Sequence, residues 1–595
     1  MTVPAPWLRF DFAPGPVGRP LVFAEPLRVV EAWTLEAVVP ALRSVQAEAD
    51  AGRWAAGFVA YEAAPAFDPA MTVVPRGPDE SLPLLWFGVF DGPRPVGDEP
   101  PGTGADQPLP GWTASTSPDE YDRAIAEIRA AIARGDSYQV NHTLRLTGPW
   151  PATDRPGDLR QYARLRRAQA ARYAAYLDLG RHRVVSVSPE LFFERDGTRV
   201  TTRPMKGTRA RGRWPAEDEA AARALLASEK DRAENVMIVD LLRNDLGRLA
   251  RPGTLDVPDL LTLERYPTVW QLTSTVTAEV PAATGLAELF GALFPCGSVT
   301  GAPKIATMRQ IARLEDEPRH VYCGSVGVVA PGGAATFNVA IRTVEVDSAT
   351  GTGRYGVGGG ITWDSSAADE HAEVLAKAAV LRAEAPGFAL LETLRLEDGT
   401  FWLQGRHLDR LRASAGYFGR PDPTAAVEEA LAAVAADHPQ GHWRVRLLVD
   451  LPGEVRTEAF PLEPTPGPVL VLRAGEPVHS SDVFLQHKTT HRDAYAPARR
   501  LLAQHPEAHD VLLHNERGEL TELTTGNLVL DLDGTRCTPP LDCGLLGGVE
   551  RAEALAAGLL VERVLVPADL ERADGAWLLN SVRGWLPVCQ TLQAG

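Results

Sequence analysis

The stretch Glu384-Ala385-Pro386-Gly387 divides this chain of 595 residues into two parts. A helical pattern that runs from about 367 to 383 stops there at a Pro-Gly pair, and a new strand pattern begins at Phe388. Single domains rarely exceed about 250 to 300 residues before they split, so a boundary is expected in a chain of this length. We predict one structural part in residues 1–385 and another in residues 386–595, with no internal repeat connecting them.

The composition is that of a globular protein with an excess of acidic groups. The chain has 60 Lys and Arg against 77 Asp and Glu, a formal net charge of −17, which disfavours nucleic acid and anionic membranes as partners. No uninterrupted apolar run of about 18 residues predicts a membrane span, and the first 20 residues lack the pattern of a secretory signal. Five cysteines without a Cys-x-x-Cys pair indicate reduced thiols. A cytoplasmic location is therefore expected.

The part before Pro386 mixes strand and helix patterns. Apolar runs at 57–61 and 84–90 predict strands, and 121–133 predicts a helix with Ser117 or Asp119 as its cap. Further strands are expected at 183–194, 200–202, 322–329, 337–346 and 355–361, and helices at 217–249 and 367–383. The Pro- and Gly-rich residues 92–112 predict a surface excursion. We expect an α+β domain whose N-terminal portion is 1–112 and whose catalytic region is 113–385.

Two carboxylates and one ammonium group share a helix face near the end of this part. Glu370, Glu373 and Lys377 fall at helical offsets 0, 3 and 7. Such a face can hold Mg²⁺ together with a substrate carboxylate, because Mg²⁺ takes few protein carboxylates and completes its octahedron with water and substrate oxygen. An exposed face with an ion pair between Glu373 and Lys377 explains the same spacing.

A glycine run and a second acidic helix accompany this face. Residues 356–360 are Gly-Val-Gly-Gly-Gly, where backbone amides can approach an anionic ligand closely. The run lacks the layout of a dinucleotide-binding fingerprint. Within the helical pattern that follows Asp231, Glu234 can reach a metal from another element, whereas Asp240 and Arg243 are explained by a structural pairing.

Several motifs then occur in the order found in one enzyme family. They are Ser188-Pro189-Glu190-Leu191-Phe192, Pro204-Met205-Lys206-Gly207-Thr208, the helix 234–247, Gly297-Ser298-Val299-Thr300-Gly301-Ala302-Pro303-Lys304, Ile341-Arg342 and the helix 370–377. This order resembles the chorismate-utilising enzymes over about 55–385, nearest to those that make 4-amino-4-deoxychorismate, with anthranilate synthase a close relative. The resemblance implies an anthranilate synthase component I-like mixed-sheet fold, with Mg²⁺ as cofactor and chorismate as substrate.

Lys206 separates two activities within that family. Aminodeoxychorismate synthases carry lysine at this motif position, and anthranilate synthases generally do not. The resemblance implies that the lysine amine attacks the chorismate ring and expels the 4-hydroxyl, after which ammonia displaces the lysine and the amino group ends on C4. Without this covalent relay, direct amination at C2 leads towards anthranilate. A salt-bridged lysine without a chemical role is the alternative interpretation of Lys206.

The resemblance also implies roles for the other motif residues. Glu190 is implied as the general acid or base at the leaving hydroxyl. Glu234 and Glu373 are implied as Mg²⁺ ligands, with Glu370 in support. The substrate carboxylates are assigned to Ser298, Arg342, Lys377 and the backbone of Gly358, Gly359 and Gly360. Arginine suits this task because its planar guanidinium can bind a carboxylate through two hydrogen bonds.

Two features depart from what a complete synthase needs. Gln271 stands where many relatives have histidine, and glutamine cannot take up a proton near neutral pH, so it is not expected to drive pyruvate elimination. No glutaminase motif is found: Cys296 lies in Pro-Cys-Gly-Ser rather than in a Gly-x-Cys-x-Gly elbow, and no His-x-Glu follows. Ammonia is therefore expected to be free or to come from a separate glutamine amidotransferase subunit.

The motifs after Pro386 resemble a second family. They are Leu391-Glu392-Thr393-Leu394-Arg395, a helix that contains His407 and Arg410, His487-Lys488-Thr489-Thr490, the run Glu-Leu-Thr-Glu-Leu-Thr-Thr-Gly-Asn at 519–527, and Leu545-Leu546-Gly547-Gly548-Val549-Glu550-Arg551. Their order resembles the fold-type IV pyridoxal-phosphate enzymes, which include branched-chain and D-amino-acid aminotransferases and aminodeoxychorismate lyase. The resemblance spans essentially Phe388 to the C-terminus and implies pyridoxal 5′-phosphate as the cofactor.

The second resemblance assigns the cofactor contacts. Lys488 is implied to form the Schiff base and move protons, and Glu522 to keep the pyridinium nitrogen protonated, which makes the cofactor an electron sink. The phosphate is assigned to Arg410 and to the backbone of Gly548 and Val549. Glu550 stands where relatives often have a phosphate-binding threonine. A surface cation is the alternative interpretation of Arg410.

The two resemblances together predict a bifunctional enzyme. Amination of chorismate to 4-amino-4-deoxychorismate is expected in the first part, followed by elimination of pyruvate in the second to give 4-aminobenzoate, the aromatic unit of folate. Two alternatives remain at this point. The second part is an aminotransferase fused to an aminodeoxychorismate or anthranilate synthase, or one part has decayed into a regulatory binding module. The oligomeric state, including dimerisation of the second part, is left open.

Overall fold

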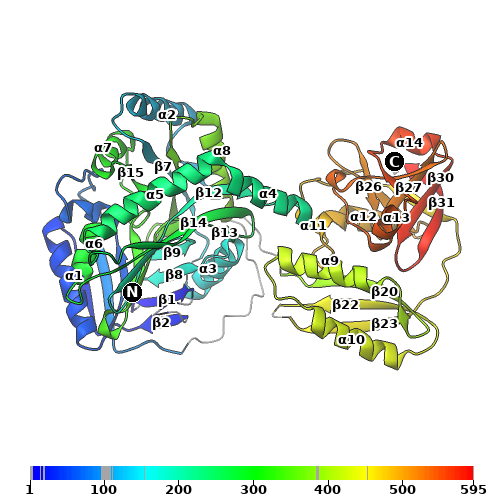
Figure 1. Ribbon diagram of the computed structural model, residues 1–595, viewed down its shortest axis with the longest axis horizontal. Helices are drawn as coiled ribbons and strands as arrows, with labels where there is room; N and C mark the ends of the chain where they lie inside the picture. The colour runs from blue at the N-terminus through cyan, green and yellow to red at the C-terminus, as the bar shows by residue number, and fades with distance from the viewer. Residues whose placement is uncertain are drawn as a thin grey trace. The chain divides into compact units, whose positions relative to one another are not determined.

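The chain folds into two compact units in this computed structural model, which describes residues 5–593 except 14, 16, 18, 19, 96–108, 110, 153, 383–386 and 452. The first unit consists of Met1–Ala210 and Ala222–Ala385, and the second of Arg211–Ala221 and Pro386–Gly595 (Figure 1). The junction expected around Pro386 and most of the surface excursion expected at 92–112 lie outside the described residues. The assignment of residues 211–221 to the second unit was not expected from the sequence.

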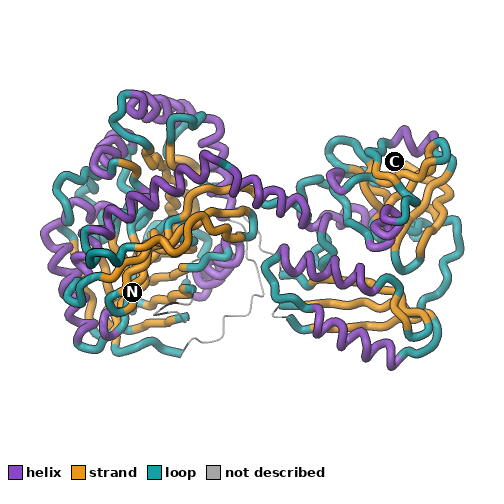
Figure 2. The backbone as a smooth tube through the Cα atoms, viewed as in Figure 1, coloured by secondary structure: helices purple, strands orange, loops and turns teal. Residues whose placement is uncertain are grey.

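Two antiparallel sheets form the framework of the first unit (Figure 2). The first sheet has the strand order β15 (Gly301–Ala302), β7 (Gln139–Pro149), β19 (Thr352–Ile361), β18 (Thr343–Asp347), β9 (His182–Ser188), β8 (Tyr173–Asp178), β1 (Trp7–Phe12) and β2 (Leu21–Ala24), with β6 (Thr113–Ala114) beside β7. The second has the order β12 (Met205–Ala210), β14 (Val269–Glu279), β11 (Arg199–Arg203), β10 (Leu191–Asp196), β17 (Ala335–Val339), β16 (Ser325–Val329), β4 (Trp54–Val59), β5 (Leu85–Phe90) and β3 (Arg28–Ala32), with β13 (Asp256–Arg265) beside β14. Residues of both sheets, among them Phe10 and Phe58, share one buried core.

Helices cover the other faces of both sheets and bury their apolar stripes there. The second sheet packs against α1 (Leu35–Asp50), α5 (Glu229–Gly247) and α6 (Leu286–Leu293). The first sheet packs against α2 (Pro118–Ala133), α3 (Arg155–Gln169) and α8 (Ala367–Ala378). The remaining helices of this part of the sequence are α4 (Pro215–Ala227) and α7 (Lys304–Leu314). The expected cap of α2 is confirmed, because Ser117 and Glu120 form a capping box there.

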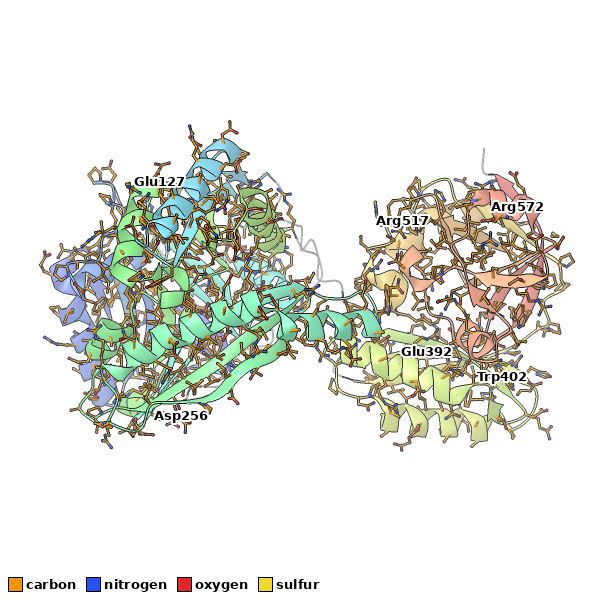
Figure 3. All side chains as sticks on the ribbon, turned by 45° about the horizontal axis from the view of Figure 1, so that its top comes forward. Glu127, Asp256, Glu392, Trp402, Arg517 and Arg572 are labelled. Atoms are coloured by element: carbon orange, nitrogen blue, oxygen red, sulfur yellow. The ribbon has the colours of Figure 1, made fainter. Side chains whose placement is uncertain are left out.

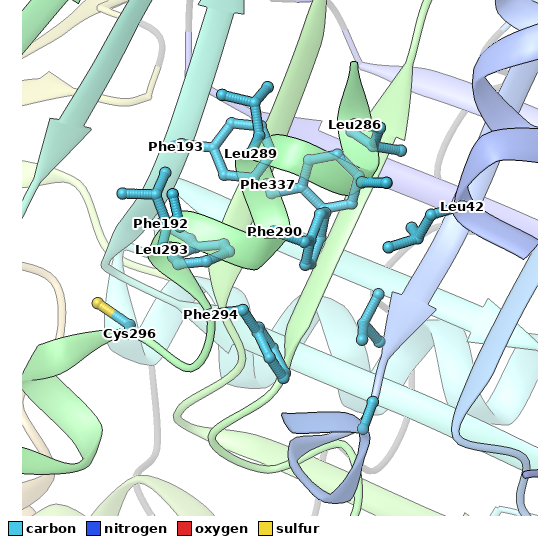
Figure 4. Packing of buried hydrophobic residues seen from close by; sticks show 14 of the residues in the cluster. Leu42, Phe192, Phe193, Leu286, Leu289, Phe290, Leu293, Phe294, Cys296 and Phe337 are labelled. Atoms are coloured by element: carbon cyan, nitrogen blue, oxygen red, sulfur yellow. The ribbon is translucent and has the colours of Figure 1, made fainter. Parts of the chain in front are cut away.

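Five phenylalanine rings pack together on the face of the second sheet that α6 covers (Figure 4). The ring centroid of Phe290, on α6, lies 5.2 Å from that of Phe337, 5.6 Å from that of Phe193 and 5.7 Å from that of Phe192. Phe294 joins these rings at 5.6 Å from Phe290. Because Phe192 follows Glu190 by two residues and Phe294 precedes Ser298 by four, the cluster also fixes the backbone of two site segments.

Three elements that the sequence predicts as continuous are each divided in two in the structure. The helix predicted at 217–249 is two helices, α4 and α5, because Ser228 caps a new helix with its hydroxyl bonded to the amide of Asp231. The strand predicted at 183–194 is interrupted between β9 and β10 at Pro189 and Glu190. The strand predicted at 337–346 is also two strands, β17 and β18, which belong to different sheets. By contrast, the hairpin predicted across Asp196-Gly197 is present as β10 and β11.

The second unit has two smaller α/β layers. In one, the strand order is β21 (Thr400–Phe401), β20 (Leu390–Glu397), β22 (His442–Val449) and β23 (Val455–Pro461), with α9 (Gln404–Tyr417) and α10 (Thr424–Asp437) packed on it. In the other, the order is β26 (Leu520–Leu523), β25 (Asp510–His514), β24 (Val469–Arg473), β31 (Gly584–Gln593), β30 (Gly575–Asn580), β27 (Gly526–Leu532), β28 (Thr535–Thr538) and β29 (Val561–Glu562). Its helices are α11 (Val483–Gln486), α12 (Ala496–Gln504), α13 (Val549–Ala556) and α14 (Pro567–Arg572). Within the described ranges, no helix has the length and apolar character needed to cross a membrane.

Truncating Phe290 tests the importance of the phenylalanine cluster. We expect Phe290→Ala to lower the free energy of unfolding by about 3–5 kcal/mol, because the side chain is fully buried and leaves a cavity. Leu27→Ala is the control, since Leu27 is 53% exposed and its loss should cost less than about 0.5 kcal/mol. The measurement is denaturant unfolding of the full chain, and equal effects of the two changes would contradict the prediction.

Candidate active sites

A cavity of about 460 Å³ in the first unit brings together every site residue predicted before Pro386. Its walls include Glu190, Lys206, Glu234, Ser298, Arg342, Gly358, Gly359, Gly360, Glu370, Glu373 and Lys377. These residues come from both sheets and from the helices α5 and α8, so the cavity exists only when the layers are packed. A cavity of this size suits a small ligand, and its mixture of cations and carboxylates favours an anionic one accompanied by a metal ion.

Lys206 enters the cavity from β12. Its backbone carbonyl accepts a hydrogen bond of 3.1 Å from the Asn235 side chain on α5, which fixes the strand at this point. The Lys206 amine lies over Gly360, where a Cβ would come within 3.1 Å of Nζ. The same Cβ would lie 2.2 Å from Nε2 of the buried Gln139, so a side chain at position 360 would displace groups beside the Lys206 amine.

Glu190 is a buried acid beside this lysine. The residue is only 3% exposed, and its Oε1 atom has no hydrogen-bond partner within the described part of the chain. Burial raises the pKa of Glu190 to about 7, against the opposing effects of the Ser298 hydroxyl and the Lys206 ammonium. A carboxyl that titrates near neutral pH can both give and accept a proton, as general acid–base catalysis requires.

The acidic face of α8 points into the same cavity. Glu373 pairs with Lys377 at 2.6 Å, which is the ion pair that an exposed face would also form. Lys377 also donates a hydrogen bond to the Gly358 carbonyl at 2.8 Å. Burial lowers the pKa of Lys377, and Glu373 opposes this shift. Glu370 accepts a hydrogen bond of 2.6 Å from Ser365. This face lines the cavity instead of facing solvent alone.

The carboxylates of the cavity repel one another. Burial raises the pKa of Glu234 and of Glu370, and the charge of Glu373 adds to both shifts. A divalent cation would relieve this repulsion. Among the residues that the structure describes, no three or more His, Cys, Asp or Glu side chains are grouped as a ready-made metal site. Carboxylate oxygens such as those of Glu234, Glu370 and Glu373 are donors that suit a hard cation such as Mg²⁺, which keeps water and substrate oxygens among its ligands.

The glycine run is part of a strand rather than a loop. Residues 356–360 lie within β19 and pair with β7 in register, Gly359 opposite His142. A Cβ at Gly359 would lie 3.0 Å from Glu370 Oε2 and 3.7 Å from Lys377 Nζ. The glycines therefore leave space for the charged groups of α8 above the strand.

The cavity walls also include polar groups whose contacts the sequence indicated only in part or not at all. Arg342, at the turn between the sheets with φ 51°, donates a hydrogen bond to Gln169, which had not been predicted. Gln271 accepts a 2.9 Å hydrogen bond from the Thr208 hydroxyl through Oε1. Lys230 and Asn141 also line the cavity and were missed, because neither belongs to a recognisable motif.

In the second unit, the half-buried Lys488 lies near the buried carboxyl of Glu522. The Lys488 carbonyl accepts a 2.9 Å hydrogen bond from the Leu391 amide. Burial lowers the pKa of Lys488 to about 8, and Arg410 contributes to the shift. Glu522, on β26, accepts hydrogen bonds from the Tyr495 hydroxyl at 2.6 Å and from the Leu546 amide at 3.2 Å. Burial raises the pKa of Glu522 to about 7, against the effect of Tyr495.

Arg410 reaches this region from α9 and is held by Glu392, the residue that Figure 3 labels. Its guanidinium donates to the two Glu392 oxygens at 2.8 and 2.6 Å and to the Gly547 carbonyl at 3.2 Å. The ring of the buried His407 contacts the same carboxylate at 2.7 Å. The sequence motifs contain Glu392 and His407 but do not indicate these contacts. The arginine is therefore a positioned group and not a surface cation.

The N-terminus of α13 begins beside Arg410. Gly548 is the N-cap residue of this helix, and Val549 is its first residue. The carboxylate of Glu550 accepts a 2.8 Å hydrogen bond from Trp402, which Figure 3 labels. Free backbone amides and a neighbouring guanidinium are the groups that bind phosphate at helix N-termini.

Comparison with known proteins gives the family. The model of chorismate binding enzymes matches residues 21–383. The chain belongs to this family. The model of class IV amino-transferases matches residues 389–591. The first match ends just before the expected junction at Pro386, and the second begins just after it. The two families therefore occur in the order that the sequence predicts.

Two curated relatives each match less than half of this chain. Aminodeoxychorismate synthase component 1 of Klebsiella aerogenes is 41% identical over 266 residues, 45% of this chain and 58% of the relative. Anthranilate synthase component 1 of Streptomyces coelicolor is 43% identical over 290 residues, 48% of this chain and 55% of the relative. The chain thus spans a little more than half the length of these relatives, and their similar identities do not separate the two activities.

A solved structure shares the fold of this region. Anthranilate synthase component I from Streptococcus pneumoniae superposes with a TM-score of 0.53 at 23% identity, over 64% of this chain and 93% of that one. At this identity the likeness supports the predicted anthranilate synthase-like fold and nothing beyond it.

The raised pKa of Glu190 predicts a pH-dependent effect on stability. Between pH 4.5 and 7 the unfolded chain has released this proton while the folded chain still holds it, so the free energy of unfolding falls as pH rises. Glu190→Gln removes this pH dependence. The free energy of unfolding of the variant, relative to that of wild type, should therefore be about 3 kcal/mol higher at pH 8 than at pH 5.

Denaturant unfolding of both chains at the two pH values measures this difference. The control is Glu127→Gln, whose carboxyl is exposed on α2 (Figure 3) and pairs with Arg313. The prediction fails if Glu190→Gln shows the same change between pH 5 and pH 8 as this control.

Proposed function

We propose that the chain makes 4-aminobenzoate from chorismate in two steps, for folate biosynthesis. The first unit aminates chorismate to 4-amino-4-deoxychorismate, and the second eliminates pyruvate from that product. The observation that carries the proposal is the position of the Lys206 amine in the same cavity as Glu190 and the acidic face of α8. Overall similarity does not decide between C4 and C2 amination, whereas a nucleophilic amine at this point in the cavity favours C4.

Lys206 and Glu190 would divide the first reaction between them. The Lys206 amine forms a bond to the chorismate ring while the 4-hydroxyl leaves with a proton from Glu190. Ammonia then forms the bond to C4, the bond to Lys206 breaks, and the lysine is regenerated. Glu190 is suited to this proton transfer because its pKa of about 7 keeps both protonation states accessible.

The cations and carboxylates around the cavity would hold the substrate. Arg342 and Lys377 bind the substrate carboxylates, with Ser298 as a hydrogen-bond donor. Glu234 and Glu373 would hold Mg²⁺ with support from Glu370, and the ion would neutralise a substrate carboxylate and fix its orientation. Gln271 cannot accept a proton in this site, so the first unit would release its product without aromatising it.

The second unit offers the groups that pyridoxal phosphate needs. Arg410, Gly548 and Val549 would bind the phosphate, and Glu522 would pair with the ring nitrogen. Bound there, the cofactor would supply an electron sink for a carbanion at the carbon that carries the amine. Lys488 would take the proton from C4 of the aminated product, since its lowered pKa leaves the amine partly unprotonated near neutral pH. Loss of pyruvate from C3 then yields the aromatic ring.

Ammonia would come from a separate glutamine amidotransferase subunit or from solution. Cys296, two residues before Ser298, is an unsuitable glutaminase nucleophile because burial raises the pKa of its thiol to about 12.

The match to class IV amino-transferases favours one alternative. In it, the second unit transfers the amino group of an unrelated amino acid, and the first unit works independently. Lys488 and Glu522 serve either reaction, so only the products distinguish the two proposals.

The proposed function predicts the products of a defined mixture. Chorismate, Mg²⁺, ammonia, pyridoxal phosphate and the purified chain should yield 4-aminobenzoate and pyruvate in equal amounts, measured by chromatography and a coupled pyruvate assay. Lys206→Ala should lower this rate at least about a hundredfold because it removes the nucleophile. Arg209→Ala, an exposed change on the same strand, is the matched control. Anthranilate as the sole aromatic product would refute the assignment.

Lys488→Ala tests the second unit separately. We expect chorismate consumption to continue while 4-amino-4-deoxychorismate accumulates, because the variant lacks the base that removes the C4 proton. Arg412→Ala, an exposed change on α9, should leave 4-aminobenzoate as the product. Unchanged 4-aminobenzoate output from Lys488→Ala would favour the independent aminotransferase over the lyase.

A further inference from the structure

The second unit includes a segment that lies within the sequence of the synthase. Arg211–Ala221 belong to this unit, although residues on both sides of them belong to the first. The segment begins five residues after Lys206 and includes the start of α4. Neither family match gives it a role in the second site.

The segment is tightly organised by one carboxylate. Asp218, which is 6% exposed, accepts two hydrogen bonds from Arg211 at 2.6 and 2.7 Å and one from the Gly212 amide at 3.0 Å. A Cβ at Gly212 would lie 2.1 Å from the Asp218 nitrogen, so only glycine fits this turn. The guanidinium of Arg211 is therefore presented in one orientation.

That guanidinium and the Gly212 carbonyl both bind Tyr417 at the end of α9. The Tyr417 hydroxyl donates to the Gly212 carbonyl at 2.8 Å, and the Arg211 guanidinium lies 4.2 Å from the Tyr417 ring centroid. Arg211 also donates to the Tyr417 carbonyl at 3.1 Å. Arg213 adds hydrogen bonds to the Ser480 carbonyl at 3.2 Å and to Asp542 at 2.5 Å. Tyr417 is thus fixed through its ring, its hydroxyl and its backbone.

Tyr417 in turn packs on His487, the residue directly before Lys488. The two ring centroids lie 4.3 Å apart, and Ser414 contacts the His487 Nδ1 atom at 2.9 Å. His487 is 2% exposed, and burial lowers its pKa to about 4, so its ring is neutral at pH 7. A neutral, immobilised ring before Lys488 fixes where the lysine side chain leaves the backbone without adding charge beside its amine.

We infer that Arg211, Gly212 and Tyr417 are positioning residues for Lys488, so that a segment of the synthase sequence completes the pyridoxal-phosphate site. Arg211 and Gly212 hold Tyr417, Tyr417 holds His487, and His487 sets the position of the lysine amine. The inference deepens the proposed function, because it rests on Lys488 being the cofactor-binding lysine. It does not depend on whether the second unit acts as a lyase or as an aminotransferase.

The test uses the full-length chain with pyridoxal phosphate alone as the probe. Tyr417→Phe keeps the ring against His487 and removes only the hydroxyl bonded to Gly212, and Arg211→Met removes the guanidinium. Arg412→Met is the matched control, since Arg412 is exposed on the same helix and pairs with the surface residues Asp409 and Asp422. The dissociation constant of pyridoxal phosphate and the pH at the midpoint of the titration of its bound visible absorption are measured for each chain.

We expect Tyr417→Phe and Arg211→Met each to weaken pyridoxal phosphate binding about fivefold, the effect of losing one buried hydrogen bond, and to shift the midpoint. The control should match wild type in both measurements. Chorismate consumption with Mg²⁺ and ammonia should stay within about twofold of wild type in all three variants, because none of them removes a group of the first cavity.

Two outcomes would overturn the inference. One is wild-type affinity and an unchanged midpoint in both Tyr417→Phe and Arg211→Met. The other is a parallel loss of chorismate consumption in these variants, which would give the segment a role in folding the first unit instead. If the wild-type chain itself shows no visible absorption with pyridoxal phosphate, the proposed function of the second unit fails, which is a distinct result.

Discussion

The packing of Phe290 against neighbouring phenylalanine rings is the interaction on which the first cavity depends. Phe192 and Phe193 directly follow the segment that carries Glu190, and Phe294 precedes the one that carries Ser298. A buried polar group keeps a defined position only when the backbone on either side cannot move, and close-packed aromatic rings provide that constraint. The chemistry at the cavity therefore rests on apolar contacts a few residues away.

Burial has opposite effects on acids and amines in both units, and the two proposed mechanisms use this difference. Loss of hydration disfavours the charged form, which raises the pKa of Glu190 and Glu522 and lowers that of Lys377 and Lys488. For Glu190, Glu522 and Lys488 the shifted pKa values of about 7, 7 and 8 lie in the range where protons exchange near neutral pH. Both units thus obtain acid–base groups by the same physical means, although different family models match them.

The sequence predicts local structure well where neighbouring residues decide it. The Ser117 cap and the hairpin at Asp196-Gly197 depend on residues a few positions apart, and both are confirmed. The break at Ser228 was missed because the apolar periodicity continues through it, and only the hydroxyl bonded to the Asp231 amide shows that a new helix starts. The division of 337–346 between two sheets was missed because a strand pattern carries no information about the partner strand.

The sequence by itself determined the order of the two families, the motif residues of each site and the lysines expected to react. Motifs keep their spacing along the chain, so they can be recognised without coordinates. Only the tertiary structure decided that Glu392 and His407 hold Arg410, that Glu550 turns to Trp402, and that Arg211–Ala221 belong to the second unit. These relations join residues up to about two hundred positions apart, and long-range contacts of this kind are set by how the layers pack rather than by any local pattern.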